Sequence, residues 1–240
     1  MKVSAFITEQ LLLFSVKLWY DKKRNQFRRR KMKDSIIFDV DGTIWDSTGV
    51  VEDAWNEAFL KLDITDRTVT ADELKTLFGR PMEEIIEMIF PNKPLEERKK
   101  IGKMCFEYEH AFLRKQAGEV YEGMEETLKR LSEHYELYIV SNCQAGYIET
   151  VLHATGFGPY FKDHICPGDS GLLKADNIKL IMEKHQLKDT VYVGDTQMDA
   201  DACKQAGVPI IFAAYGFGTV REPDYVINTP KDLLKLMKMG

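Results

Sequence analysis

Two aspartates stand one residue apart directly after an apolar run. The run Ile36–Phe38 precedes Asp39 and Asp41, and Gly42 and Thr43 follow. Strand geometry would put both carboxylates on one side, although Gly42 indicates that the chain is already turning. Ligands of open α/β sheets bind just beyond the carboxyl ends of strands. The pair could therefore hold one divalent metal ion, or divide into a nucleophile and a general acid or base. The structural alternative is a strand-end turn.

Three later segments carry further polar residues. Two of them are apolar runs, at 137–140 and 191–193, and polar residues follow each run. The third is the start of a helical stretch at 174. The residues concerned are Ser141, Asn142, Lys174, Asp195 and Asp199. If both runs are strands of a parallel sheet, their ends lie at the same sheet edge as the two aspartates.

These four segments resemble, in sequence order, the four motifs of the haloacid dehalogenase (HAD) superfamily. The last segment has its Gly-Asp-x-x-x-Asp pattern, and the resemblance extends from about residue 34 to the C-terminus. The stretch 42–47 most resembles phosphoglycolate phosphatase-like enzymes of subfamily I. This resemblance implies a Rossmann-like parallel sheet and a Mg²⁺-dependent phosphatase that hydrolyses a small phosphorylated metabolite through an aspartyl-phosphate.

The resemblance also implies residue roles. Asp39 would attack phosphorus, Asp41 would protonate the leaving alcohol and later deprotonate water, and Lys174 would neutralise the transferring group. The Mg²⁺ ligands would be Asp39, Asp41 (through its backbone carbonyl), Asp195 and Asp199. Phosphate and substrate would contact Ser141, Asn142, Gly42, Thr43 and Arg80.

Some of these residues have ordinary structural explanations. Ser141 and Asn142 could cap a helix. Lys174 could be a solvated lysine, and Lys179 competes for its role because alanine follows Lys174 where relatives often have proline. Arg80 belongs to a stretch, 78–81, that resembles a substrate-contacting cap loop. We expect it to bind an anionic or polar part of the substrate; the alternative is a solvated arginine. The run 216–218, Gly-Phe-Gly, could bring backbone close to the site.

The fold class follows from short apolar runs that alternate with helical stretches, which indicates a parallel sheet with crossover helices. We predict strands at 35–40, 136–141, 164–166, 190–194, 208–213 and 226–227. We predict helices at 123–134, 144–155, 174–186, 197–206 and 230–238. The region between the first two motifs has helical texture at 50–62, 71–78, 81–90 and 94–116.

The predicted architecture is therefore α/β, with a Rossmann-like core and an inserted α-helical cap. We predict a core domain of residues 34–48 and 119–240 and a cap domain of residues 49–118. The hinges are expected after Thr43 and around 118–123. Caps of this kind close over the substrate and exclude water.

The first 33 residues differ in charge from the rest of the 240-residue chain. They hold ten Lys or Arg and two acidic residues, a net charge of +8, whereas the remainder holds 23 basic and 36 acidic residues, a net charge of −13. We expect 1–33 to be an extension outside the core. An apolar stretch at 11–20 is too short and too interrupted for a membrane span. It lacks a small-residue cleavage site, although a surface anchor through residues 1–31 remains an alternative.

Net charge and cysteine content bear on the binding partners and the cellular compartment. A net charge of −5 disfavours a general nucleic-acid binder. Four scattered cysteines form no Cys-x-x-Cys pair, which suits a cytoplasmic protein. We expect a monomer or dimer. The competing functions are a phosphosugar mutase of the β-phosphoglucomutase type and a catalytically silent binding protein on the same fold.

Overall fold

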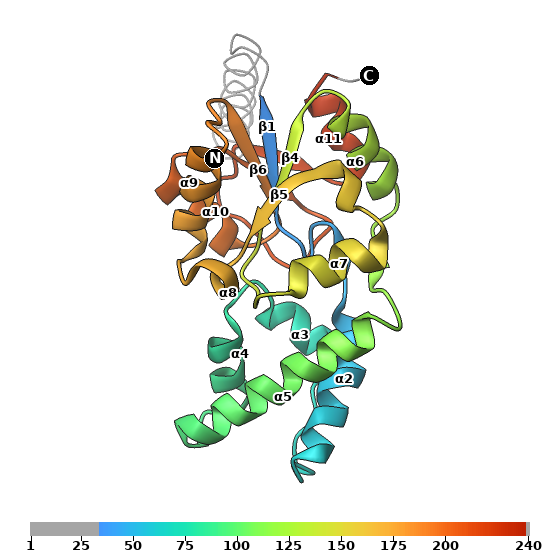
Figure 1. The fold of residues 1–240 in the computed structure, drawn as a ribbon, viewed down its shortest axis with the longest axis vertical. Coiled ribbons are helices and arrows are strands. Elements are labelled where there is room, and N and C mark those ends of the chain that lie inside the picture. Colours follow the sequence, from blue (N-terminus) through green and yellow to red (C-terminus); the bar gives the residue numbers. More distant parts are fainter. Residues whose placement is uncertain (1–33, 239–240) are drawn as a thin grey trace, which may run out of the picture. The chain divides into compact units, whose positions relative to one another are not determined.

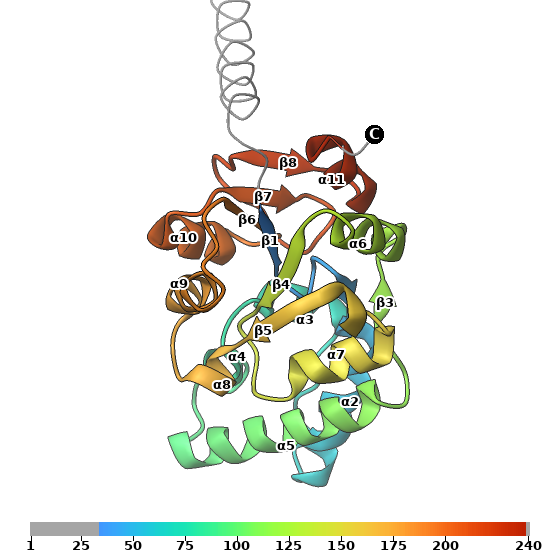
Figure 2. The same cartoon turned by 45° about the horizontal axis from the view of Figure 1, so that its top comes forward.

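The computed structural model describes residues 34–238. In this range one parallel sheet is flanked by helices, and a helical insertion lies at one end of it (Figures 1 and 2). The predictions made for residues 1–33, including the surface anchor, lie outside the described residues.

The sheet of the described region has six strands in the order β5-β4-β1-β6-β7-β8, all paired in parallel. These are β1 (Ser35–Phe38), β4 (Glu136–Val140), β5 (Phe161–Ile165), β6 (Thr190–Gly194), β7 (Ile210–Ala213) and β8 (Tyr225–Ile227). β1, β4 and β6 are almost wholly buried, as the continuous apolar runs predict for a sheet covered on both faces. The chain leaves β1 toward β4 and later returns to the other side of β1, so the strand order reverses there.

Helices cover both faces of this sheet (Figures 1 and 2). α9 (Lys174–Lys184) and α10 (Gln197–Ala206) pack together on one face, and α6 (Met124–Ser132) and α11 (Pro230–Leu236) pack together on the other. α7 (Tyr147–Thr155) follows β4, and the single turn α8 (Pro167–Ser170) follows β5. The predicted Rossmann-like arrangement is confirmed.

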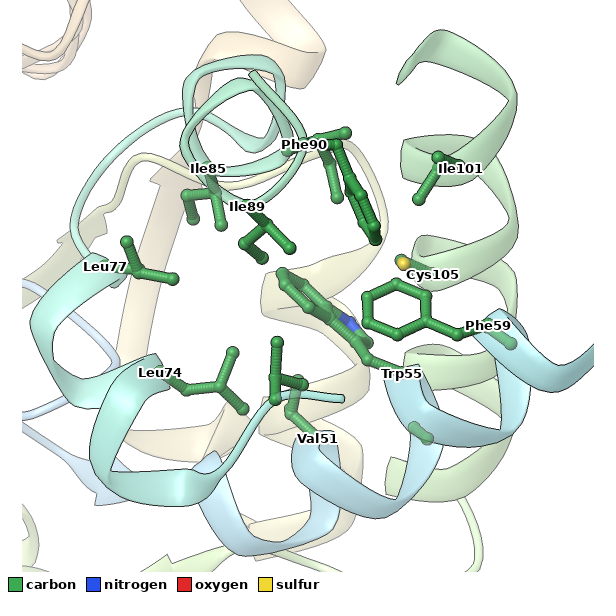
Figure 3. Close-up of a cluster of buried hydrophobic side chains, with 14 of the residues drawn as sticks. Val51, Trp55, Phe59, Leu74, Leu77, Ile85, Ile89, Phe90, Ile101 and Cys105 are labelled. Atoms are coloured by element: carbon green, nitrogen blue, oxygen red, sulfur yellow. The ribbon is translucent and has the colours of Figure 1, made fainter. Parts of the chain in front are cut away.

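The insertion after β1 is α-helical, as predicted. It consists of α2 (Thr48–Lys61), α3 (Ala71–Leu77), α4 (Met82–Ile89) and α5 (Leu95–Leu113). Its helices enclose an apolar cluster around Trp55 and Phe59, with isoleucine, leucine and phenylalanine side chains from α3, α4 and α5 around them (Figure 3). A cap with a core of its own can keep its shape while it moves as a body.

Two very short strands that the sequence analysis missed lie where the chain enters and leaves the cap. β2 (Trp45–Asp46) pairs antiparallel with β3 (Glu119–Val120). Two-residue strands give no periodic signal, so their pairing depends on the tertiary structure. A Cβ atom at Gly118 would lie 2.8 Å from the carbonyl oxygen of Asp46. Glycine thus permits the close approach of the two crossing segments.

Several boundaries also differ from the sequence prediction. β5 begins at Phe161, three residues earlier than expected, and α7 begins at Tyr147, three residues later. Gly146 has a φ of 87°, a left-handed conformation that a continuous helix from 144 would not allow. α5 ends at Leu113, not near 116.

No helix among residues 34–238 is long and apolar enough to span a bilayer. The four cysteines are free thiols.

Candidate active site

Three strand ends meet at the reversal of the sheet. Asp39 follows β1, Ser141 follows β4 and Asp195 follows β6, and these strands are adjacent in the order β4-β1-β6. Parallel pairing brings their carboxyl ends to one edge, where the crevice of a doubly wound sheet binds ligands. The strand order therefore brings together residues more than a hundred positions apart.

A buried group of carboxylates forms the centre of this edge. Oxygen atoms of Asp39, Asp195 and Asp199 lie within 4.8 Å of one another, and all three residues are buried. Carboxylate oxygens suit hard divalent cations. The side chain of Asp41 does not belong to this group; the resemblance implied its backbone carbonyl as ligand.

Lys174 supplies the positive charge in this cluster. It is 4% exposed, and its Nζ lies 3.0 Å from Asp39 Oδ1 and 2.6 Å from Asp199 Oδ1. Lys179, the competing lysine, is exposed and pairs with Asp176. The difference arises because Lys174 is the first residue of α9, at the edge where the strand ends meet.

Charge and burial shift the pKa values here in opposite directions. Burial, and then the neighbouring Asp199 and Asp39 carboxylates, raise the pKa of Asp195 well above its ordinary value. Burial also raises the pKa of Asp39, with Lys174 opposing it. Burial works against ionisation of Asp199 as well, but Lys174 and hydrogen bonds from Thr196 lower its pKa overall. Burial alone would lower the pKa of Lys174, yet the Asp199 and Asp39 charges raise it, so the ammonium stays protonated. Three carboxylates surround one ammonium and repel one another, so a further cation would be bound favourably among them.

Local hydrogen bonds fix the acids. Thr196 donates from its backbone nitrogen (3.0 Å) and its Oγ1 (2.7 Å) to Asp199 Oδ2. The backbone nitrogen of Asp199 donates in return to Thr196 Oγ1 at 3.3 Å, and the two bonds from backbone nitrogens form the capping box of α10. The backbone nitrogen of Phe217 donates to Asp195 Oδ2 at 2.8 Å, as the Gly-Phe-Gly run suggested, and Thr43 Oγ1 donates to Asp195 Oδ1 at 3.3 Å.

Gly42 is required by the same packing. Its φ of +78° is in the left-handed region, and a Cβ atom there would lie 2.1 Å from Asp195 Oδ2. Any side chain at this position would displace the carboxylate. The absence of a side chain at Gly42 therefore allows the turn after β1 to pack against Asp195.

Asp41 has an environment of its own. Its Oδ1 accepts hydrogen bonds from Ser47 Oγ (2.6 Å), Tyr147 OH (2.8 Å) and Trp45 Nε1 (3.0 Å). Burial raises the pKa of Asp41 to about 7, although these hydrogen bonds oppose the rise. A carboxyl group poised near neutrality can both give and take a proton.

A small pocket between core and cap faces these groups. Its cavity volume is about 60 Å³, and its core-side lining includes Asp39, Asp41, Ser141 and Asn142. Ser141 is buried, and its side chain helps to lower the pKa of Asp39. Asn142 Nδ2 donates to the cap carbonyl oxygen of Gly79 at 2.9 Å.

Arg80 reaches the same pocket from the cap. It is part of the lining, but its Nη1 donates to the carbonyl oxygens of Thr76 (2.9 Å) and Leu77 (3.3 Å) at the end of α3. The guanidinium is thus bound to its own helix end, with further N–H groups left for a substrate.

Comparison with known proteins identifies the family of the chain. Residues 36–213 match the family described as haloacid dehalogenase-like hydrolase. The chain belongs to this family. The phosphoglycolate phosphatase of Photobacterium profundum is 28% identical over 223 residues, which cover 85% of this chain and 96% of the relative. That of Aquifex aeolicus is 25% identical over 209 residues, covering 84% and 95%.

Solved structures share the fold of this HAD-like hydrolase. One, described as a predicted phosphoglycolate phosphatase from Haemophilus somnus, superposes with a TM-score of 0.75 at 22% identity and covers 86% of this chain and 98% of its own. CbbY from Rhodobacter sphaeroides, solved with phosphate, gives 0.72 at 20% identity, covering 86% and 100%. The family match makes the chain a HAD-like hydrolase, and the named relatives are phosphatases.

Sequence reasoning missed several residues of the HAD-like site. Thr196, Tyr147 and Ser47 hold Asp199 and Asp41, and Glu109 of the cap lines the pocket. Thr196 had a readable signal, because Thr-x-x-Asp at a helix start is a capping box. Tyr147 and Glu109 had none, because nothing in their local sequence distinguishes them from packing residues.

Proposed function

We propose that this HAD-like protein is a Mg²⁺-dependent phosphomonoesterase that hydrolyses a small phosphorylated metabolite through an aspartyl-phosphate on Asp39. The observation that carries the proposal is the contact between the buried Lys174 ammonium and the carboxylate of Asp39, a residue that lines the pocket. A carboxylate so placed is oriented for attack, and a fixed positive charge stabilises the transferring phosphoryl group.

The donor set fits Mg²⁺. Asp39, Asp195 and Asp199 offer oxygen ligands at one point, and these three buried carboxylates share the single buried ammonium of Lys174, which contacts two of them. Asp39 and Asp195 are the proposed side-chain ligands, with Asp199 as a ligand or a hydrogen-bonding neighbour. When bound, the ion offsets the repulsion between a carboxylate nucleophile and an anionic phosphate.

The remaining steps belong to the chain itself. Asp39 attacks phosphorus, and Asp41, with a pKa near 7, protonates the leaving oxygen and then takes a proton from the hydrolytic water. Ser141 and the backbone amide of Asn142 bind phosphate oxygens. Gly42 and Thr43 hold the turn that carries both aspartates. The side chain of Asn142 donates to the cap, so the residue that binds phosphate also helps to keep the cap closed against water.

Metal removal tests this function. We expect phosphate release from small esters, 2-phosphoglycolate among them, to require Mg²⁺ and to vanish in excess chelator, with Ca²⁺ a poor substitute because of its larger, looser coordination. Mg²⁺ should also raise the melting temperature, by a stabilisation of about 2.7 kcal/mol at 100 times its Kd.

A matched pair of variants controls the metal experiment. Asp195→Asn should lose the Mg²⁺-induced shift, whereas Asp201→Asn, the same change at an exposed site on α10, should keep it. Full phosphatase activity in chelator, or an unchanged shift in Asp195→Asn, would contradict the proposal.

Arg80 is proposed to select substrate without taking part in the phosphoryl transfer. Arg80→Ala should raise KM for the preferred ester roughly tenfold and change kcat for p-nitrophenyl phosphate much less. Steady-state kinetics on both substrates, with Arg67→Ala as a cap arginine outside the pocket lining, measure this. Equal losses on both substrates would instead indicate that Arg80 acts by holding the end of α3.

A further inference from the structure

The buried stripe of α5 contains an acid where an apolar residue would be expected. Ile101, Cys105, Glu109 and Leu113 recur every four residues and face the cap interior, and Glu109 is 6% exposed. Burying a carboxyl group costs free energy unless it is well paired. Within residues 34–238 its hydrogen-bond donor is Trp55, whose Nε1 lies 2.8 Å from Oε2, and no lysine or arginine forms an ion pair with it.

Glu109 also belongs to the wall of the pocket that holds Asp39 and Asp41. Burial raises the pKa of Glu109 to about 8, and the Asp41 charge adds to the rise. Burial, and then the charges of Asp41 and Glu109, raise the pKa of the Tyr147 phenol. Glu109, Asp41 and Tyr147 thus line the same pocket and influence one another's pKa.

The rest of the cap wall is poor in polar groups. Trp55 and Phe78 contribute apolar surface to it, as do Met82, Ile85 and Phe106. The Trp55 indole lies within the cap cluster in Figure 3, and its N–H is already taken by Glu109. Arg80, the cation in the lining, donates from Nη1 to carbonyl oxygens at the end of α3. A leaving group at the cap wall therefore meets apolar surface, the Glu109 carboxyl group and the Arg80 N–H groups that these carbonyl oxygens leave free.

We propose that Glu109 determines substrate class by hydrogen-bonding a hydroxyl group of the leaving alcohol, so that the preferred esters are hydroxylated alkyl or polyol phosphates. The inference rests on the proposed phosphatase function. A mostly protonated carboxyl group offers one donor and one acceptor, which a hydroxyl matches in either direction. A substrate carboxylate would instead place a charge against a cap wall that is largely apolar.

Three esters of similar size test the assignment: 2-hydroxyethyl phosphate, 2-phosphoglycolate and ethyl phosphate. With Mg²⁺, we expect kcat/KM of the wild-type protein to be highest for 2-hydroxyethyl phosphate, by about tenfold over ethyl phosphate. Glu109→Leu should reduce that ratio about tenfold. Glu109→Gln should keep most of it, because the amide has a donor, an acceptor and an oxygen for Trp55.

Controls separate selectivity from folding. Glu107→Leu, the same change two residues earlier at an exposed position of α5, should leave the ratio unchanged, and thermal melting should show that each variant is folded. If Glu109 served only to anchor Trp55, Glu109→Leu would lower all three kcat/KM values together, and that result would overturn the proposal. A wild-type preference for 2-phosphoglycolate would overturn it too.

The two proposals fail in different ways. If p-nitrophenyl phosphate and all three esters release no phosphate, the phosphatase function itself is wrong. If phosphate is released but the ratio between hydroxylated and plain esters does not depend on Glu109, the function stands and the inference on Glu109 is wrong.

Discussion

Asp39→Asn should reduce phosphate release by about 10⁴-fold or more while the protein stays folded. An amide is a poor nucleophile and a poor ligand for a hard cation. The amide oxygen can still accept from Lys174, and the change removes one negative charge from a crowded acidic group. We therefore expect a melting temperature in the absence of metal that equals or exceeds that of the wild type.

Phosphate-release assays and thermal melts of the same preparation measure both effects. Asp34→Asn is the matched control, since this exposed aspartate precedes β1 on the same segment. Acid trapping of a phosphorylated wild-type protein, absent in Asp39→Asn, would add direct support. A folded Asp39→Asn protein with near-wild-type turnover would refute the proposed mechanism.

Lys174→Met should impair both activity and stability. Loss of the ammonium leaves the carboxylates of Asp39 and Asp199 buried without their cation, and breaking such a buried pair costs about 3–5 kcal/mol. For a domain of this size the melting temperature should fall by roughly 6–20 °C. Loss of a fixed charge at the transferring group should lower kcat roughly 10²- to 10³-fold.

Mg²⁺ provides a check on the cause of this destabilisation. If excess negative charge is responsible, Mg²⁺ should restore part of the lost melting temperature. Lys179→Met is the control, because this exposed lysine on the same helix pairs with Asp176 at the surface. Such a surface ion pair should contribute little to the stability of the protein. Equal stability loss in the two variants would argue against the buried charge cluster as the cause.

The sequence alone predicted the chemistry-bearing positions of the core. Apolar runs that end in Asp39, Ser141 and Asp195 are local patterns, and the sheet edge they predict follows from general rules of parallel sheets. The helical cap was likewise readable, since α2 and α5 are long and Pro81 and Pro94 stand at the starts of α4 and α5.

Other features needed the tertiary structure because their partners are distant in sequence. The choice of Lys174 over Lys179 is decided by where α9 meets the strand ends, and the pKa of Asp41 is set by burial and by Tyr147, 106 positions away. The contribution of cap residues to the pocket could not be predicted from the sequence either. Glu109 looks like any acid on a charged helix until α5 packs on α2 and directs it into the pocket. Local sequence thus determined which strand ends carry acids, whereas long-range packing decided their protonation, their partners and what the substrate meets.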